Sequence, residues 1–256
     1  MIEVSGITFS YNEKEVLKEI SFKIEERERV VLLGCNGSGK STILKILNGL
    51  IFPEKGKYFF KGQSIEKGSF KNAEFSKNFR KSNVMLFQSP DVMIFNPTCY
   101  DEIAFGLRQL DLPEKETREI VLRWAKLLEI EKYLNIPPFE LSGGEKQKLI
   151  LACLLALQPE VLLLDEPMAN LDPKSQGYII DLLWDLPVTS IISTHNLSLA
   201  PELGERAILL SEDHKIIYDG AIEELLSKEE LLIEANLIHK HKHKHRQLAH
   251  SHYHKH

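Results

Sequence analysis

The stretch that decides the fold is Gly34-Cys35-Asn36-Gly37-Ser38-Gly39-Lys40-Ser41-Thr42. It follows the short β-rich apolar run 29–34 and precedes residues 41–50, whose pattern predicts a helix. It fits G-x-x-x-x-G-K-[ST], a pattern that becomes specific when a strand comes before it and a helix after it. This context disfavours the alternative, a chance match in a turn.

The residue types of this loop suit phosphate binding. Its glycines let backbone N–H groups converge on phosphate oxygens, and the helix start adds the positive end of its dipole. Lys40 is expected to neutralise the β- and γ-phosphates of ATP, and the Ser41 hydroxyl to reach Mg²⁺. The loop therefore predicts a site for ATP and Mg²⁺.

The run Val161-Leu-Leu-Leu-Asp165-Glu166-Pro167 is apolar and ends in two acids. Such a strand is typical of the inside of a parallel sheet, whose carboxyl edge binds ligands. We expect Asp165 to hold Mg²⁺ through water. Glu166 points to another side of the extended chain, where it is expected to accept a proton from an attacking water. Without the loop, a strand meeting a solvated acidic turn would explain this run equally well.

A second anion site is indicated at Leu141-Ser142-Gly143-Gly144-Glu145, which opens a helix expected to run to Leu157. Ser-Gly-Gly at a helix start exposes N–H groups beside a hydroxyl. A plain N-cap with flexible glycines is the alternative. Because one nucleotide does not need two complete phosphate cradles, we interpret this one as serving the nucleotide of a second subunit.

The rest of the chain places these motifs in an α/β core. Residues 1–34 read as strands, and residues 61–82 as a polar, lysine-rich surface excursion. A helical insertion occupies about residues 90–157, after which strands resume. We therefore expect the following organisation: an ATPase domain over residues 1–222, a helical extension over 223–238 and a disordered histidine-rich tail over 239–256.

Composition excludes several classes of protein. The net charge of -5 hides an acidic body, since residues 239–256 are basic; such a body suits nucleic acid poorly. The longest apolar stretch, 149–157, is too short to span a bilayer, for which about 20 residues are needed, and the N-terminus shows no secretory signal. Three scattered cysteines (Cys35, Cys99, Cys153) indicate a reducing cytosol rather than a disulfide or zinc framework.

Together these motifs resemble those of the ATP-binding subunit of an ABC transporter, over residues 1 to about 222. The resemblance implies an α/β P-loop NTPase fold with an inserted helical subdomain and a short N-terminal antiparallel β-subdomain. The matching segments are the loop 34–42 (Walker A), 161–166 (Walker B), 141–145 (signature motif), Gln88 (Q-loop), Asn170-Leu171-Asp172 (D-loop), His195 (switch histidine) and Tyr11 (adenine stacking).

The same resemblance implies roles for individual residues. The catalytic set would be Lys40, Gln88, Glu166 and His195, with Ser41, Gln88 and Asp165 at Mg²⁺. The nucleotide set would be Tyr11, Gly34, Asn36, Gly37, Ser38, Gly39, Lys40, Ser41 and Thr42, together with Ser142, Gly143 and Gly144 of a second ATPase subunit, either a copy or a paralogue. Two positions depart from the family pattern: Cys35 stands where proline is usual, and Asn170 where Gly, Ser or Ala is usual.

A longer string is more specific. Phe87-Gln88-Ser-Pro90-Asp91, Phe95-Asn-Pro97-Thr98 and Asp101-Glu102-Ile-Ala104-Phe105-Gly106 resemble the Q-loop region of energy-coupling-factor importers, particularly their cobalt and nickel branch. The resemblance implies a groove for short helices of the membrane-embedded T subunit. Asp91, Asp101 and Glu102 then offer acidic contacts to basic helix tips, or belong to a solvated loop and helix start, where acids are favoured anyway.

The tail holds eight histidines, none adjacent to another: His239, His241, His243, His245, His250, His252, His254 and His256. Imidazole suits Ni²⁺ and Co²⁺, so we expect metal binding that buffers or senses metal rather than selecting it. The alternatives are an expression tag and a pH-responsive cationic tail. His214, beside Glu212 and Asp213, is read as an exposed turn residue without a role.

The sequence thus predicts the ATPase subunit of an energy-coupling-factor importer for cobalt or nickel at the cytoplasmic face of the membrane. Its partners would be a second ATPase subunit, the T subunit and a membrane subunit that binds the substrate. One alternative is a similar importer for a vitamin or other micronutrient. The other is a soluble ABC protein of DNA repair or translation, which the acidic body and the lack of coiled coils or tandem cores disfavour.

Overall fold

The computed structural model describes residues 1–169, 171–245 and 248–255, and the side chains as far as Ile238. The chain divides into two compact units. One comprises Met1–Lys67 and Ser190–His256, and the other comprises Gly68–Thr189. Among the described residues no helix is both long and apolar enough to span a bilayer.

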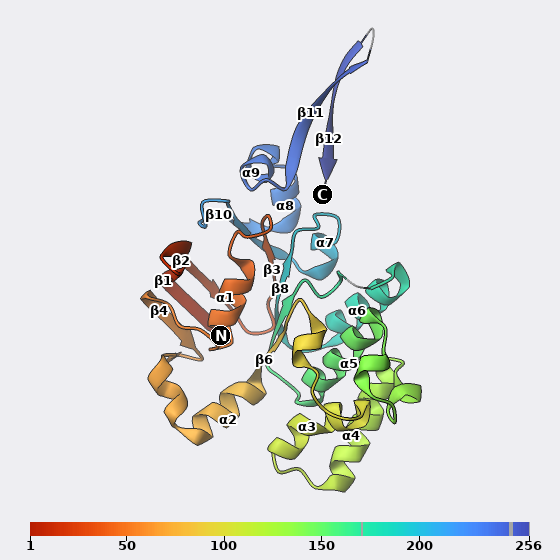
Figure 1. Ribbon diagram of the computed structural model, residues 1–256. Helices are drawn as coiled ribbons and strands as arrows, with labels where there is room; N and C mark the ends of the chain where they lie inside the picture. The colour runs from red at the N-terminus through yellow and green to blue at the C-terminus, as the bar shows by residue number, and fades with distance from the viewer. Residues whose placement is uncertain (170, 246–247, 256) are drawn as a thin grey trace. The chain divides into compact units, whose positions relative to one another are not determined.

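The first unit contains an antiparallel sheet with the strand order β2-β1-β4-β5, drawn in red to orange in Figure 1. Alternate side chains of β1, among them Ile2 and Val4, are buried, as expected for a strand with one face on a core. This sheet confirms the predicted N-terminal antiparallel β-subdomain. The strands are β1 (Ile2–Tyr11), β2 (Lys14–Ile24), β4 (Lys55–Phe60) and β5 (Gln63–Ser64).

The same unit also contains strands in the order β10-β9-β3-β8. β3 is parallel to both neighbours, and Leu33 at its end lies opposite Thr194 of β8 and Leu209 of β9. Residues that follow these three strands therefore emerge at one sheet edge. The strands are β3 (Arg29–Leu33), β8 (Thr189–Thr194), β9 (Arg206–Leu210) and β10 (Ile216–Ala221); the helices are α1 (Lys40–Leu47), α7 (Ala200–Leu203), α8 (Ile222–Leu226) and α9 (Glu229–Glu234).

The C-terminal segment differs from its predicted disorder. Its backbone forms an antiparallel pair, β11 (Ile238–His245) with β12 (Leu248–Lys255), seen in blue in Figure 1. The physical reason is that an alternating sequence of period two is compatible with a strand, and each strand satisfies the other's backbone hydrogen bonds.

The second unit is mainly helical. Its strands β6 and β7 are parallel, with Leu86 opposite Leu164. Its elements are η1 (Lys67–Lys71), α2 (Ala73–Ser82), β6 (Asn83–Leu86), η2 (Pro90–Met93), α3 (Cys99–Gln109), α4 (Glu114–Leu127), η3 (Glu131–Tyr133), η4 (Pro138–Glu140), α5 (Gly143–Ala156), β7 (Val161–Asp165) and α6 (Pro173–Asp185). Helices α3, α4 and α5 fall within the predicted insertion.

One part of the surface excursion predicted for residues 61–82 is a helix with its own apolar contacts. In α2, Phe75 and Phe79 lie four residues apart, on one helix face, and their ring centroids are 5.8 Å apart. Phe70 packs edge-on against Phe79 at 5.2 Å, and Phe79 is buried. The lysines of this stretch obscured the aromatic spacing that stabilises it.

Candidate nucleotide-binding site

The phosphate-binding loop connects β3 to α1 in the first unit. Gly37 and Gly39 have φ angles of 85° and 110°, which favour glycine and allow successive N–H groups to face a common concavity. Lys40 is buried, and its Nζ donates to the carbonyl oxygens of Gly34 at 2.7 Å and Cys35 at 3.0 Å. The Lys40 ammonium group is therefore held by backbone carbonyls of its own loop.

Two further predicted residues belong to the same unit. His195 follows Thr194, which lies opposite Leu33, so it emerges beside the start of the loop at Gly34. Tyr11 is 42% exposed at the end of β1. Its ring meets Phe9 edge-on, with centroids 4.9 Å apart, which leaves Tyr11 accessible for stacking on a planar ring.

The acids of β7 lie in the second unit. β6 ends at Leu86 and β7 at Asp165, and Leu86 lies opposite Leu164. Gln88 therefore follows its strand by two residues and Glu166 follows its strand by one, at the same edge of this parallel pair. Asp165 and Glu166 are both buried. Glu166 has a φ angle of 49°, and its carbonyl accepts from the N–H of Ala169 at 3.2 Å. This unusual backbone shape is therefore supported by a turn directly after β7.

Ser142 is the N-cap of α5. Its Oγ accepts from the N–H of Glu145 at 3.4 Å, and a Glu145 carboxylate oxygen accepts from the N–H of Ser142 at 2.8 Å, a complete capping box. Hydrogen bonds from Tyr133, the larger cause, and from Ser142 lower the pKa of Glu145. Ser142 and Gly143 are exposed, so the helix start remains accessible to an anion. In the D-loop resemblance, Asp172 caps α6, whereas Asn170 lies outside the described residues.

Glu102 fits neither of the two roles considered for it, an acidic docking contact or a place in a solvated helix start. It is only 4% exposed. Its carboxylate accepts from the backbone N–H groups of Phe95 at 3.0 Å and Asn96 at 2.8 Å. A buried carboxylate that is committed to backbone donors stabilises the loop before α3 and does not face a partner.

Asp91 and Asp101 also have partners within the second unit. Asp91 pairs with Lys146 at 2.7 Å. Asp101 accepts from Thr98 Oγ1 at 2.6 Å and pairs with Arg108 at 3.0 Å. These interactions, Thr98 first, lower the pKa of Asp101. Each acid therefore has an internal structural role at a loop or helix start.

Two site residues were missed from the sequence. Gln147 is buried in α5, and its Nε2 donates to the carbonyl of Pro167 at 2.9 Å, directly after Glu166. A polar residue beside the apolar run 149–157 was the available signal. His214, read as an exposed turn residue, is instead partly buried, with Nδ1 3.3 Å from the carbonyl oxygen of Ser38.

The cysteine that replaces the usual proline is not activated. Burial, and secondly the charge of Glu212, raise the pKa of Cys35 above its ordinary value. Because the thiolate is the reactive form, Cys35 is mainly an unreactive thiol at neutral pH. An unreactive thiol of this kind behaves as a small apolar packing residue.

Metal-ligating side chains do not gather elsewhere in the part of the chain that the structure describes. Among residues whose side chains the structure describes, no group of three or more His, Cys, Asp or Glu side chains lies close enough to hold a metal. The side chains of the eight tail histidines lie outside the described ones, and His256 lies outside the described backbone as well. The tail therefore stays a prediction.

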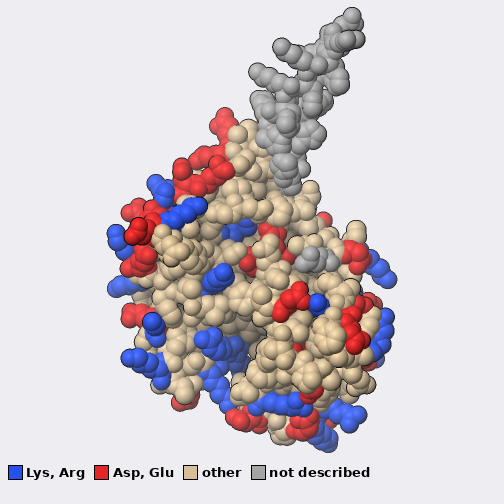
Figure 2. Space-filling model, viewed as in Figure 1, with Lys and Arg blue, Asp and Glu red and all other residues tan. Residues whose placement is uncertain are grey.

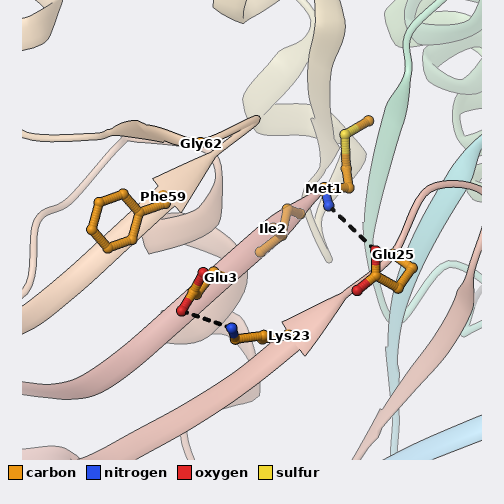
Figure 3. Close-up of a pocket in the computed structure, with 7 residues that line it drawn as sticks. All are labelled: Met1, Ile2, Glu3, Lys23, Glu25, Phe59 and Gly62. Atoms are coloured by element: carbon orange, nitrogen blue, oxygen red, sulfur yellow. Dashed lines mark ion pairs between the residues drawn. The ribbon is translucent and has the colours of Figure 1, made fainter.

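A cavity of about 420 Å³ lies on the antiparallel sheet of the first unit, away from every predicted motif. Figure 3 shows that its charged groups face one another: Glu3 pairs with Lys23 at 3.0 Å, and the amino terminus of Met1 with Glu25 at 4.0 Å. With its charges paired internally, this cavity offers no cluster of free phosphate donors.

A glycine-rich loop that connects a parallel strand to a helix and carries a buried lysine defines a P-loop nucleotide-binding protein. The model of the ABC transporter family matches residues 17–169, so the chain belongs to this family. It is therefore an ATPase that binds ATP.

Relatives support this assignment along most of the chain. A putative ABC transporter ATP-binding protein of Methanosarcina acetivorans is 43% identical over 247 residues, which cover 94% of this chain and 90% of the relative. The energy-coupling factor transporter ATP-binding protein EcfA of Methanocaldococcus jannaschii is 39% identical, covering 93% and 85%.

Solved structures give the same result. The structure of cbiO1 from Clostridium perfringens, part of the ABC transporter complex cbiONQ, has a TM-score of 0.77 and 31% identity, covering 92% of this chain and 94% of that one. A dimeric ATP-binding cassette bound to ADP and Pi has a TM-score of 0.78 and 28% identity, covering 87% and 99%. The predicted fold class is confirmed.

Proposed function

We propose that this ATPase is the peripheral, cytoplasmic-face subunit of an energy-coupling-factor importer and powers the uptake of cobalt or nickel. The observation that carries the proposal is the likeness to cbiO1 over nearly the whole of both chains. Relatives named EcfA support the energy-coupling-factor type. The histidine-rich tail supports a metal rather than a vitamin as the substrate.

Two ATPase subunits, identical or paralogous, would bind two ATP molecules head to tail. Each ATP would contact Tyr11, the loop 34–42, Gln88 and Asp165 of one subunit, and Ser142–Gly144 of the other. The accessible start of α5 supports the second contact. A site completed only on closure binds ATP more tightly in the closed dimer, so ATP drives closure and hydrolysis releases it.

The donor set suits Mg²⁺. Ser41, Gln88 and Asp165 offer hydroxyl, amide and carboxylate oxygens, the ligand type that this hard cation prefers. When bound, Mg²⁺ would neutralise phosphate charge. Glu166 would take the proton of the attacking water, and His195 would hold the γ-phosphate in position.

Replacing Ser142 with Ala should separate capping from catalysis. Loss of the N-cap should cost about 1 kcal/mol of unfolding free energy. If Ser142 also binds the partner's ATP, hydrolysis should fall at least about tenfold, a change of about 1.4 kcal/mol in the activation free energy. A single subunit should still bind ATP. Urea unfolding, steady-state hydrolysis and binding of labelled ATP measure the three quantities.

The matched control is Asn72→Ala. Asn72 caps α2 by accepting from the N–H of Phe75 at 3.0 Å, so its loss should cost a similar free energy and leave hydrolysis unchanged. Equal hydrolysis by both variants would argue against a composite site.

Exposed apolar side chains shortly after Gln88 in the sequence support docking of a membrane subunit. Val92 and Phe95 are 72% and 65% exposed, and Phe95 meets Phe105 edge-on at 4.8 Å. Exposed apolar groups of this size mark interaction surfaces, and short amphipathic helices are suitable occupants. A cavity of about 570 Å³ is also lined in part by Phe105. Its basic lining residues lie in α2 or just before it: Lys71, Lys77, Arg80 and Lys81. Blue side chains are visible in this part of the surface in Figure 2.

The tail is proposed to bind Ni²⁺ or Co²⁺ as a cytoplasmic buffer. The backbone register supports this, since His239, His241 and His243 occupy positions opposite His254, His252 and His250. Paired positions bring two imidazole-bearing residues to the same place on the hairpin, and imidazole is a good ligand for both metals.

The metal proposal is tested by the cobalt and nickel content of native cells grown at trace external metal. Cells with Glu166→Gln should lose most of one metal, because uptake stops when hydrolysis stops. Cells whose protein ends at Ile238 should retain uptake, because the tail does not select the metal. Unchanged metal content after a confirmed loss of hydrolysis would exclude the metal substrate and favour the vitamin importer.

A further inference from the structure

The turn between β9 and β10 lies against the phosphate-binding loop. β9 is parallel to β3, and Leu209 lies opposite Leu33, so both strands lead into their loops at one edge. The approach is close: a Cβ atom built on Gly34 would be 2.9 Å from the carbonyl oxygen of Leu210. The residues after Leu210 are therefore neighbours of the loop through the topology of the sheet.

His214 contacts the loop from this turn. Its Nδ1 lies 3.3 Å from the carbonyl oxygen of Ser38, a residue that is only 1% exposed. A carbonyl oxygen only accepts hydrogen bonds, so Nδ1 must carry the proton. The contact thus selects the Nδ1–H form of a neutral ring and is equally compatible with the charged ring.

This hydrogen bond affects the orientation of the Gly39 amide, which would face phosphate. In a planar trans peptide, the carbonyl of Ser38 and the N–H of Gly39 point in opposite directions. Holding the carbonyl toward His214 therefore directs the N–H of Gly39 away from that turn. Gly37 and Gly39 have positive φ angles, so this peptide would otherwise be among the freest in the loop.

The turn itself is well anchored. The carbonyl of His214 accepts from the N–H of Lys18 at 3.0 Å, and the N–H of His214 donates to Ser211 at 3.1 Å. Asn236 Nδ2 donates to Glu212 Oε1 at 2.8 Å. His214 has a φ angle of 65°, a conformation that glycine adopts more easily. A histidine placed there brings a hydrogen-bond donor that glycine would lack.

We propose that His214 is a positioning residue for ATP binding: its Nδ1–H holds the Ser38 carbonyl and thereby orients the Gly39 amide toward the phosphates. The inference rests on ATP binding at the loop 34–42. His214 would act through the loop backbone, without contacting ATP itself.

The test compares His214→Gly with His214→Asn in the purified full-length chain. Glycine relieves the φ angle and removes the donor, whereas asparagine places an amide nitrogen near the position of Nδ1 and tolerates positive φ. The Kd and KM for MgATP should rise about fivefold in the glycine variant, in line with the loss of one hydrogen bond. Asparagine should restore them to within about twofold, and kcat should stay unchanged in both.

Two results would overturn the inference. The first is a wild-type Kd in the glycine variant, and the second is a ¹⁵N spectrum that shows a neutral His214 protonated at Nε2. A purely structural role would lower the melting temperature of the glycine variant without the split between KM and kcat. Lys40→Ala serves to separate the two assumptions: if it leaves the Kd unchanged, the loop does not bind ATP, and the failure belongs to the proposed site rather than to His214.

Discussion

Glu166→Gln is expected to lower ATP turnover by a factor of about 10²–10⁴, the usual contribution of a general base, while ATP binding stays intact. An amide keeps the size of the side chain and can hydrogen-bond to water, but it cannot take the proton of that water. Glu166 is buried at the end of β7, and its backbone is supported by Ala169. The change should therefore leave the local structure in place.

Three measurements make this prediction specific. Steady-state hydrolysis should fall, the Kd for MgATP should change less than about threefold, and light scattering should show an ATP-dependent dimer that accumulates because it cannot hydrolyse its nucleotide. Glu160→Gln is the control. Glu160 precedes the other end of β7 and accepts from Ser82 Oγ at 3.0 Å, and its replacement should leave turnover normal. Normal turnover in Glu166→Gln would remove this residue from the catalytic role.

Gly39→Ala is expected to weaken ATP binding about 10- to 100-fold. Gly39 has a φ angle of 110°, and an added Cβ would lie 2.7 Å from both Leu17 Cδ2 and the carbonyl oxygen of Val16. The side chain of Leu17 can move, but the backbone of β2 cannot without breaking its ladder. The loop must therefore shift just before Lys40, where its amides and cation would meet phosphate.

The control for this substitution is Gly177→Ala. Gly177 lies in α6, and a Cβ there would meet nothing within 4 Å. Alanine should stabilise the helix by about 0.5–1 kcal/mol and leave the Kd unchanged. Isothermal titration with a non-hydrolysable ATP analogue and thermal unfolding give both values. Wild-type affinity in Gly39→Ala would show that this part of the loop does not contact the nucleotide.

Much of the fold was predictable because its signals are local. The glycine loop between an apolar strand and a helix, and the N-terminal alternation, were read from neighbouring residues, and the fold class is confirmed. The start of α5 was predicted in the same way, from Ser-Gly-Gly as a helix start, and the structure adds that Glu145 completes a capping box there. The catalytic and nucleotide-contact roles stay predictions that the variants above test.

Other parts depended on contacts that local patterns do not contain. Helix α2 was missed because five positive charges over residues 67–81 outweighed its aromatic spacing. For the acids after the Q-loop, the sequence left two roles open: contact with a partner, or a place in a solvated loop and helix start. In the structure Asp91 pairs with Lys146, 55 residues away, and Glu102 is buried against backbone N–H groups. A charge on a loop looks the same in sequence whether it meets solvent, a partner or its own chain.

The difference between the features that local sequence predicts and those that depend on tertiary packing has one physical origin. Backbone conformation and helix caps depend on residues a few positions apart, so glycine, serine and an apolar run are sufficient to predict a phosphate loop and its chemistry. The choice of partner for a side chain depends instead on which strand ends become neighbours in a sheet. His214 and Ser38 are 176 residues apart, and they meet because β9 pairs with β3; no local pattern contains that pairing, which follows from packing of the whole sheet.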